Sequence, residues 1–174
     1  MDYTEDDDFI PELIDVTVAD LETDAEILRR ERRALEPVME SLQSQGFYAY
    51  GGFDDQRRWS IAVDDEAGRV DVRIGDDGFD IELWGSSPGL FSDEENEWKR
   101  RAYERLARMQ IANVARGQLA AYQHAYWDEV DHGVAVRLNY QVAFTRAPQI
   151  GAFVREHFPE VDEILGFVES QLSV

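Results

Sequence analysis

The spacing of hydrophobic residues along this chain alternates between the period of a helix and the period of a strand. Helical spacing appears first, in the apolar residues Leu35, Val38, Met39 and Leu42. Gly46 follows them and is suited to end a helix, whereas Pro37 is best accommodated in a first helical turn. This pattern predicts a helix over about residues 36–45, with an extension upstream left open.

The residues that follow switch to a period of two, which is typical of half-buried antiparallel strands. Three runs alternate in this way: Trp59 to Val63, Val70 to Ile74 and Phe79 to Leu83. Polar and glycine-containing turns separate them. Phe47 to Phe53 adds a candidate edge strand, so a meander of three or four strands is expected. On its outer face Arg69 and Arg73 are expected to pair across strands with Asp80 and Glu82.

The second half of the chain predicts helix, strand pair and helix. Ser92 and Glu95 have the spacing of a capping box, which indicates a helix over about 93–115. Its expected buried residues are Trp98, Ala102, Leu106, Met109 and Asn113. Alternating residues then predict strands around 122–126 and 134–144. A closing helix is expected from Pro148, restarted or kinked at Pro159. The predicted fold class is α+β, a twisted antiparallel sheet with helices.

Charge divides the chain unequally. The 174 residues include 37 acidic and 17 basic side chains, a formal net charge of -20. Ten of the acids lie in residues 1–24, which have no Lys or Arg. We expect residues 1–24 to form a mobile acidic segment and residues 25–174 to form a single α+β domain. Acidity disfavours direct nucleic-acid binding and favours a basic protein partner, although solubility alone is an equal explanation.

The compartment is inferred from what the sequence lacks. It contains no cysteine, and no apolar run approaches the length that a membrane span needs. The chain opens on acidic residues, unlike a secretory signal peptide. A cytoplasmic protein with no membrane partner is therefore expected.

The candidate catalytic motifs are weak. Residues 85–89 match the G-x-S-x-G pattern around Ser87, but Pro88 has no backbone N–H to offer an oxyanion, which favours an ordinary turn. The acidic pairs lack the spacing of a calcium loop, the three histidines are scattered, and no phosphate-binding glycine motif occurs. We therefore predict no catalytic residue, no metal ligand and no cofactor.

A few large apolar residues fall outside the alternation. Trp84, Leu90 and Phe91 flank the turn at 85–89, and Trp127 lies at the end of a strand. Aromatic residues at the edges of elements are typical of interaction surfaces, so these four are the candidate partner-binding residues. Capping of the core by loop side chains is the alternative.

The order of elements resembles that of the YbjN-like proteins and of the type III secretion chaperones. The matching parts are the helix that ends at Gly46, the meander from Trp59 to Leu83 and the mid-chain helix. Asn113 ahead of the second strand pair and the amphipathic closing helix complete the likeness. The resemblance implies a small, acidic homodimer that binds and stabilises other proteins without ATP. It carries over no catalytic residue.

Three functions follow as hypotheses. The first is a homodimeric, chaperone-like adaptor for a partner protein, which is itself basic or associated with nucleic acid. The second is an acidic mimic of nucleic acid that blocks a DNA- or RNA-binding protein. The third, a small hydrolase or metal-dependent enzyme, depends on Ser87 or on the acidic loops.

Overall fold

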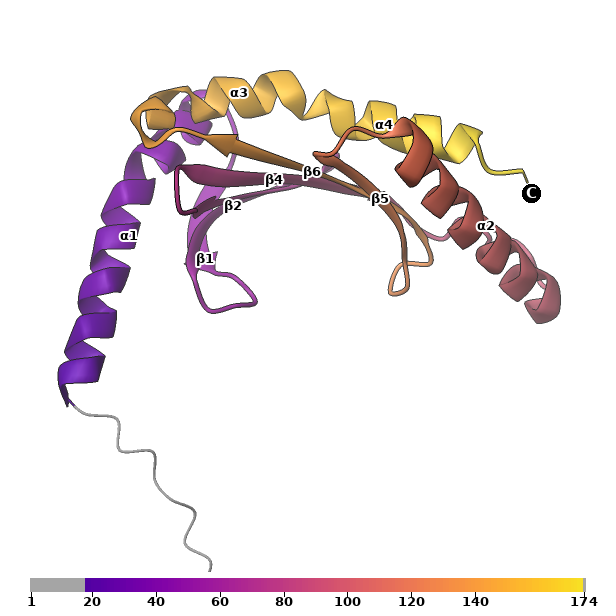
Figure 1. Ribbon diagram of the computed structural model, residues 1–174, viewed down its shortest axis with the longest axis horizontal. Helices are drawn as coiled ribbons and strands as arrows, with labels where there is room; N and C mark the ends of the chain where they lie inside the picture. The colour runs from indigo at the N-terminus through magenta and orange to yellow at the C-terminus, as the bar shows by residue number, and fades with distance from the viewer. Residues whose placement is uncertain (1–17, 174) are drawn as a thin grey trace, which may run out of the picture.

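One antiparallel sheet with helices against one of its faces makes up residues 18–173, the part of the chain that this computed structural model describes (Figure 1). The elements in chain order are α1 (Val18–Ser44), β1 (Ala49–Phe53), β2 (Trp59–Asp65), β3 (Gly68–Ile74), β4 (Phe79–Ser87), α2 (Glu97–Gln118), β5 (Gln123–Asp128), β6 (Gly133–Val142), a 3-10 helix (Phe144–Gln149), α3 (Ile150–His157) and α4 (Pro159–Ser170). The predicted α+β class is confirmed.

The sheet has six strands in the order β1-β2-β3-β4-β6-β5. Strands β1 to β4 form the predicted meander, with the candidate edge strand as its fourth member. The second hairpin joins through β6, which pairs with β4 from Phe79 opposite Val142 to Ser87 opposite Val134. Because β6 lies inside and β5 at the edge, the two ends of the sheet are β1 and β5.

The core lies on one face of the sheet. Alternate strand residues such as Val63, Val72 and Leu83 point into it, as the period of two predicted. Helix α1 covers this face at the β1 side with Leu35 and Val38, and α4 covers β4 and β6. Figure 1 shows α3 and α4 above the sheet, with α1 and α2 descending at its two ends.

Helix α1 is longer than the sequence predicted. It begins at Val18 and passes through Pro37, so the expected domain boundary at residue 24 lies inside it. Proline removes only one helical hydrogen bond, and the buried side chains of Leu35, Val38 and Leu42 hold the helix against the core on both sides of it. Gly46, with φ of 88°, ends the turn after α1 as expected. Residues 1–17, most of the predicted acidic segment, lie outside the described residues.

The prediction for α2 was wrong in its start and its buried face. Ser92 lies in a turn, where its N–H donates to the Gly89 carbonyl, and Asn96 caps the helix instead by accepting from the backbone N–H groups of Trp98 and Lys99. The buried residues are Ala107, Ile111 and Val114, a narrower stripe that sits against β5. The residues expected to be buried, Trp98, Ala102, Leu106, Met109 and Asn113, are instead exposed.

The closing segment contains three short elements. Pro148 lies inside the 3-10 helix, so α3 begins two residues later than expected, at Ile150. Pro159 begins α4, which confirms the predicted restart. This segment returns to α1 through Ser41, whose hydroxyl donates to the Pro148 carbonyl at 2.7 Å and accepts from the Gly151 N–H at 2.8 Å. A Cβ on Gly151 would lie 2.1 Å from the Ser41 carbonyl oxygen, so the two helices approach as closely as glycine allows.

We predict that Ser41→Ala lowers the free energy of unfolding by about 1–3 kcal/mol, because it leaves the buried Gly151 N–H without an acceptor. The matched control is Ser44→Ala, which removes an exposed hydroxyl that bonds only within α1 and should change stability by less than about 0.5 kcal/mol. Urea unfolding followed by circular dichroism measures both. Equal effects of the two substitutions would contradict the role given to Ser41.

Candidate protein-binding surfaces

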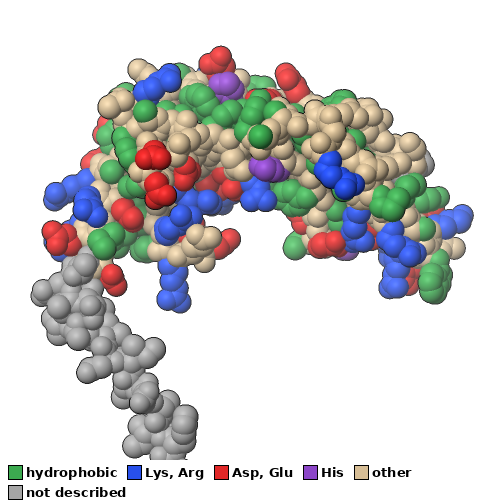
Figure 2. All heavy atoms as spheres, viewed as in Figure 1, with side chains coloured by type: hydrophobic (Ala, Val, Ile, Leu, Met, Phe, Trp, Pro, Cys, Tyr) green, Lys and Arg blue, Asp and Glu red, His purple; other side chains and the backbone are tan. Residues whose placement is uncertain are grey.

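The face of the sheet opposite the helices, here called the open face, has no helix packed on it in the part of the chain that the structure describes. It curves inward between the lower ends of α1 and α2 (Figure 1), and in Figure 2 acidic and basic side chains lie next to one another along this hollowed underside. Its residues are those that alternate with the core set, among them Asp64, Arg69, Asp71, Arg73, Asp80, Glu82, Trp84, Arg137, Asn139 and Tyr126.

Ion pairs fix the arginines of the β2–β3 half of the open face. Arg69 binds both carboxylate oxygens of Asp71, at 2.8 and 3.0 Å, and also reaches Asp64 at 3.1 Å. The hydrogen bonds to Asp71 raise the pKa of Arg69, so its charge is permanent. Tyr50 donates its hydroxyl to the same Asp64 carboxylate. The fork of Arg69 covers Asp71 almost completely, leaving it 8% exposed.

The expected cross-strand pairing of Arg69 and Arg73 with Asp80 and Glu82 was wrong. Arg73 lies opposite Asp80 in register, but its Nε faces Asp54 in the β1–β2 turn at 3.2 Å. Asp54 is held by several groups at once. Burial raises the pKa of Asp54. Hydrogen bonds from the backbone of Arg58 and Gln56, together with the charges of Arg58 and Arg73, lower that pKa by more, so the net shift is downward. The arginines therefore pair toward the β1 edge and leave Asp80 exposed.

Trp84, a predicted partner-binding residue, lies on the open face. Its indole N–H donates to the Tyr126 hydroxyl at 2.9 Å. The Arg137 guanidinium lies 5.4 Å from the centre of the Tyr126 ring, with one nitrogen 3.7 Å from Glu82. Trp84 is half-buried, and these contacts hold its ring in one orientation. The result is an ordered aromatic and cationic cluster at the β4–β6–β5 end of the open face.

The other three predicted residues come together away from Trp84. Phe91 stacks on Trp127, with ring centres 6.0 Å apart and planes 13° apart. Trp127 is only 8% exposed, and both Leu90 and Phe91 pack against the core cluster. The structure thus places these three residues where the β4–α2 turn closes over the end of the core. Their role in partner binding stays a prediction, beside the capping role that their burial favours.

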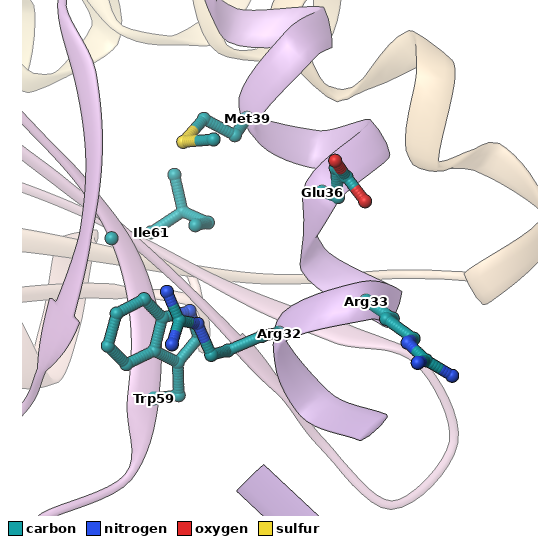
Figure 3. A pocket seen from close by; sticks show the side chains of 7 residues that line it. Arg32, Arg33, Glu36, Met39, Trp59 and Ile61 are labelled. Carbon is teal, nitrogen blue, oxygen red and sulfur yellow. The ribbon is translucent and has the colours of Figure 1, made fainter. Parts of the chain in front are cut away.

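A pocket of about 360 Å³ lies between α1 and the β1–β2 hairpin. Its floor is Trp59, packed so closely over Gly51 that a Cβ there would lie 2.5 Å from the indole ring. Figure 3 shows Arg32 reaching from α1 over the Trp59 ring, which it meets 4.5 Å from the centre, while Arg33 points away. The pocket is apolar at one side and cationic at the other. Sequence reasoning missed it, because it depends on how α1 crosses the hairpin.

A second hydrogen-bond cluster surrounds Glu160 on the helical side. Its carboxylate accepts from Tyr140 at 2.6 Å, Tyr122 at 2.7 Å and Gln123 at 2.9 Å. Burial raises the pKa of Glu160, but these hydrogen bonds lower it more, so the carboxylate stays ionised. Burial and the bond to Glu160 raise the pKa of Tyr140, which stays protonated. The two tyrosine hydroxyls and the Gln123 amide all donate to Glu160, so the cluster links the start of α4 to β5 and β6.

The motifs considered for catalysis take ordinary positions. Strand β4 runs through Ser87 and is followed by a turn from Gly89 to Ser92, with α2 starting only at Glu97, so no helix follows the serine directly. Within residues 18–173 there is no group of three or more His, Asp or Glu placed to hold a metal ion. The same residues include no helix both long and apolar enough to cross a membrane.

Comparison of the chain with protein-family models, with curated proteins and with solved structures found no match.

We predict that Glu160→Gln removes part of the acid sensitivity of the fold. A carboxyl group whose pKa is lower in the folded state stabilises the protein above its unfolded pKa, and this stability is lost as pH falls through the folded pKa. From about pH 6 to pH 3 the wild type should therefore lose more stability than the variant. Thermal unfolding across this range measures the difference. Glu163→Gln, an exposed change on the same helix, is the control, and identical slopes in wild type and Glu160→Gln would contradict the assignment.

Proposed function

We propose that this protein is a non-enzymatic, protein-binding adaptor with chaperone-like action, which works as a homodimer and without a cofactor. The observation that supports it is the open face, a sheet surface of six strands whose polar and aromatic side chains are already held in place. Binding of a partner to such a surface costs little conformational entropy, because the side chains of the adaptor are already ordered.

The balance of charge on the open face favours a protein segment as its ligand. Three arginines, at 69, 73 and 137, lie among the acids Asp64, Asp71, Asp80 and Glu82. A surface with both signs in fixed positions selects partners by complementary charges and hydrogen bonds. Trp84 adds apolar area with a polar edge, the chemistry of side chains that contribute most at protein interfaces.

The partner is itself basic or associated with nucleic acid. The net charge of -20 speeds the approach of a positive protein and discourages contact with phosphates. The resemblance to YbjN-like proteins and secretion chaperones, drawn from the order of elements, supports the same function, the homodimer and a cytoplasmic location.

A second candidate is an acidic mimic of nucleic acid. The observation in its favour is α4, whose acids Glu160, Asp162, Glu163 and Glu169 are accompanied by no basic residue. Such a surface would bind through charge alone, and its affinity would fall steeply with salt.

We predict that Trp84→Ala weakens partner binding about tenfold or more, because it removes the aromatic anchor of the open face. The measurement is affinity purification from native lysate at about 0.1 M and 0.5 M salt, followed by titration of the purified partner. Phe167→Ala removes a partly exposed aromatic from α4 on the helical side and is the matched control. Circular dichroism checks that both variants fold.

The outcome separates the two candidates. Adaptor binding should persist in part at the higher salt and depend on Trp84. Binding that vanishes with salt and ignores Trp84→Ala would favour the mimic. Recovery of no partner protein at the lower salt would contradict both, and light scattering that finds only monomer would contradict the homodimer.

A further inference from the structure

Helix α2 has an outward face that is both apolar and basic. Trp98 is 79% exposed, Met109 62% and Leu106 36%. They lie at positions 98, 106 and 109, so Leu106 and Met109 are neighbours on the helix surface and Trp98 stands two turns before Leu106 on the same side. Ala102 and Ala112 continue this exposed face. In Figure 2, blue and green side chains gather at the lower right, where Figure 1 places the start of α2.

The charge of α2 is opposite to that of the rest of the chain. It has six basic residues and two acidic ones, whereas the remaining residues include eleven basic and thirty-five acidic side chains. Two of its cations are paired, Arg101 with Glu97 at 2.5 Å and Arg108 with Glu129 at 2.6 Å. Lys99, Arg105 and Arg116 have no carboxylate partner among residues 24–173, whose side chains the structure describes.

These charges decide what can cover this face. Pairing α2 with α2 of a second copy would bury the apolar side chains but bring two helices of net charge +4 together, which costs energy. A segment that is acidic and has apolar side chains among its acids fits both properties. Residues 2–15 of this chain have that composition: seven acids, no basic residue, and the apolar side chains Tyr3, Phe9, Ile10, Leu13 and Ile14.

We propose that the outward face of α2 binds the acidic residues 2–15 of a second copy of the chain. Helix α1, which follows that segment, lies beside β1, whereas α2 lies beside β5 at the other end of the sheet (Figure 1). Within one copy, the segment would have to cross the sheet to reach α2. A second copy with its β1 edge beside the β5 edge of the first would bring the start of its own α1 near that α2. Two reciprocal contacts of this kind form a closed two-fold dimer. The inference rests on the homodimer of the proposed function and gives it an interface.

A charge exchange in the full-length protein tests the interface. The first variant is Arg105→Glu with Arg116→Glu, and the second is Asp6→Lys, Asp7→Lys and Asp8→Lys. Each alone should raise the dimer dissociation constant about tenfold or more in sedimentation equilibrium, because it removes most of the attraction: the first brings the net charge of α2 from +4 to about 0, and the second brings that of residues 2–15 from -7 to about -1. An equimolar mixture should associate more tightly than either variant alone, since in the mixed dimer one unchanged α2 faces an unchanged acidic segment and the other contact no longer sets a neutral helix against seven acids.

The control is Arg57→Glu with Arg146→Glu, which makes the same change in net charge at exposed arginines outside α2 and should leave the dissociation constant unchanged. Stronger association of the α2 variant would instead indicate symmetric α2–α2 pairing and overturn the proposal. So would a wild-type dimer that neither variant weakens, or a mixture that associates no more tightly than either variant alone. If the wild type and all variants are monomeric, both this interface and the homodimer are contradicted. The proposal that a partner protein binds through Trp84 would not be affected.

Other anionic ligands of α2 are tested in the same samples. A labelled single-stranded oligonucleotide and vesicles with anionic lipid are titrated into the wild-type dimer. If this face binds nucleic acid or membrane instead, micromolar levels of the oligonucleotide or the vesicles should dissociate the dimer. The α2 variant should then lose that binding, and the Asp6, Asp7 and Asp8 substitutions should leave it unchanged. Absence of such binding is the expected result.

Discussion

The pairing of β4 with β6 is the interaction on which the rest of the structure depends. It joins residues 79–87 to residues 134–142 along nine consecutive pairs and unites the meander with the second hairpin in one sheet. The loop that this pairing closes contains α2 and β5. Because β6 occupies the inner position, β5 becomes an edge strand and α2 can pack only against that edge. This one non-local contact thus places α2 at the β5 edge of the sheet, where it contributes only a narrow stripe, Ala107, Ile111 and Val114, to the core.

Placing all helices on one face has a second consequence. The covered face excludes water completely at residues such as Val72 and Val136, whereas the open face is partly solvated and also bonds polar groups to one another. It does so by local pairs, such as Arg69 with Asp71 and Trp84 with Tyr126. These pairs hold side chains of the open face in place, which would lower the entropic cost of binding a partner there.

The sequence predicts the strands better than the helices, for physical reasons. Alternation in Val70, Val72 and Ile74 is enforced by a sheet with one wet face, so the pattern has a single interpretation. Helix α2 has two apolar stripes, and the sequence favours burial of the bulkier one, with Trp98 and Met109. The core accepts the narrower one, with Ala107 and Ile111, because the helix must lie close to β5. The sequence predicts a shorter α1, because a proline such as Pro37 usually marks the start of a helix. In the structure, packing against the core holds the helix on both sides of Pro37.

The candidate surfaces were predictable only where they depend on residue type. Trp84 was chosen for its place beside a turn, and the structure puts it on the open face, but its hydrogen bond to Tyr126 joins strands 42 residues apart and has no local signal. Opposite charges on α2 and on the N-terminal residues are visible in the sequence. Their meaning is not, because only the structure shows that the basic helix also has Trp98 and Met109 largely exposed. The chain is acidic as a whole, but basic charge is concentrated on the exposed apolar face of α2. The surface that attracts acidic groups is therefore distinct from the acidic surface that favours solubility. Most of the surface repels other copies, and one face can still bind an acidic segment.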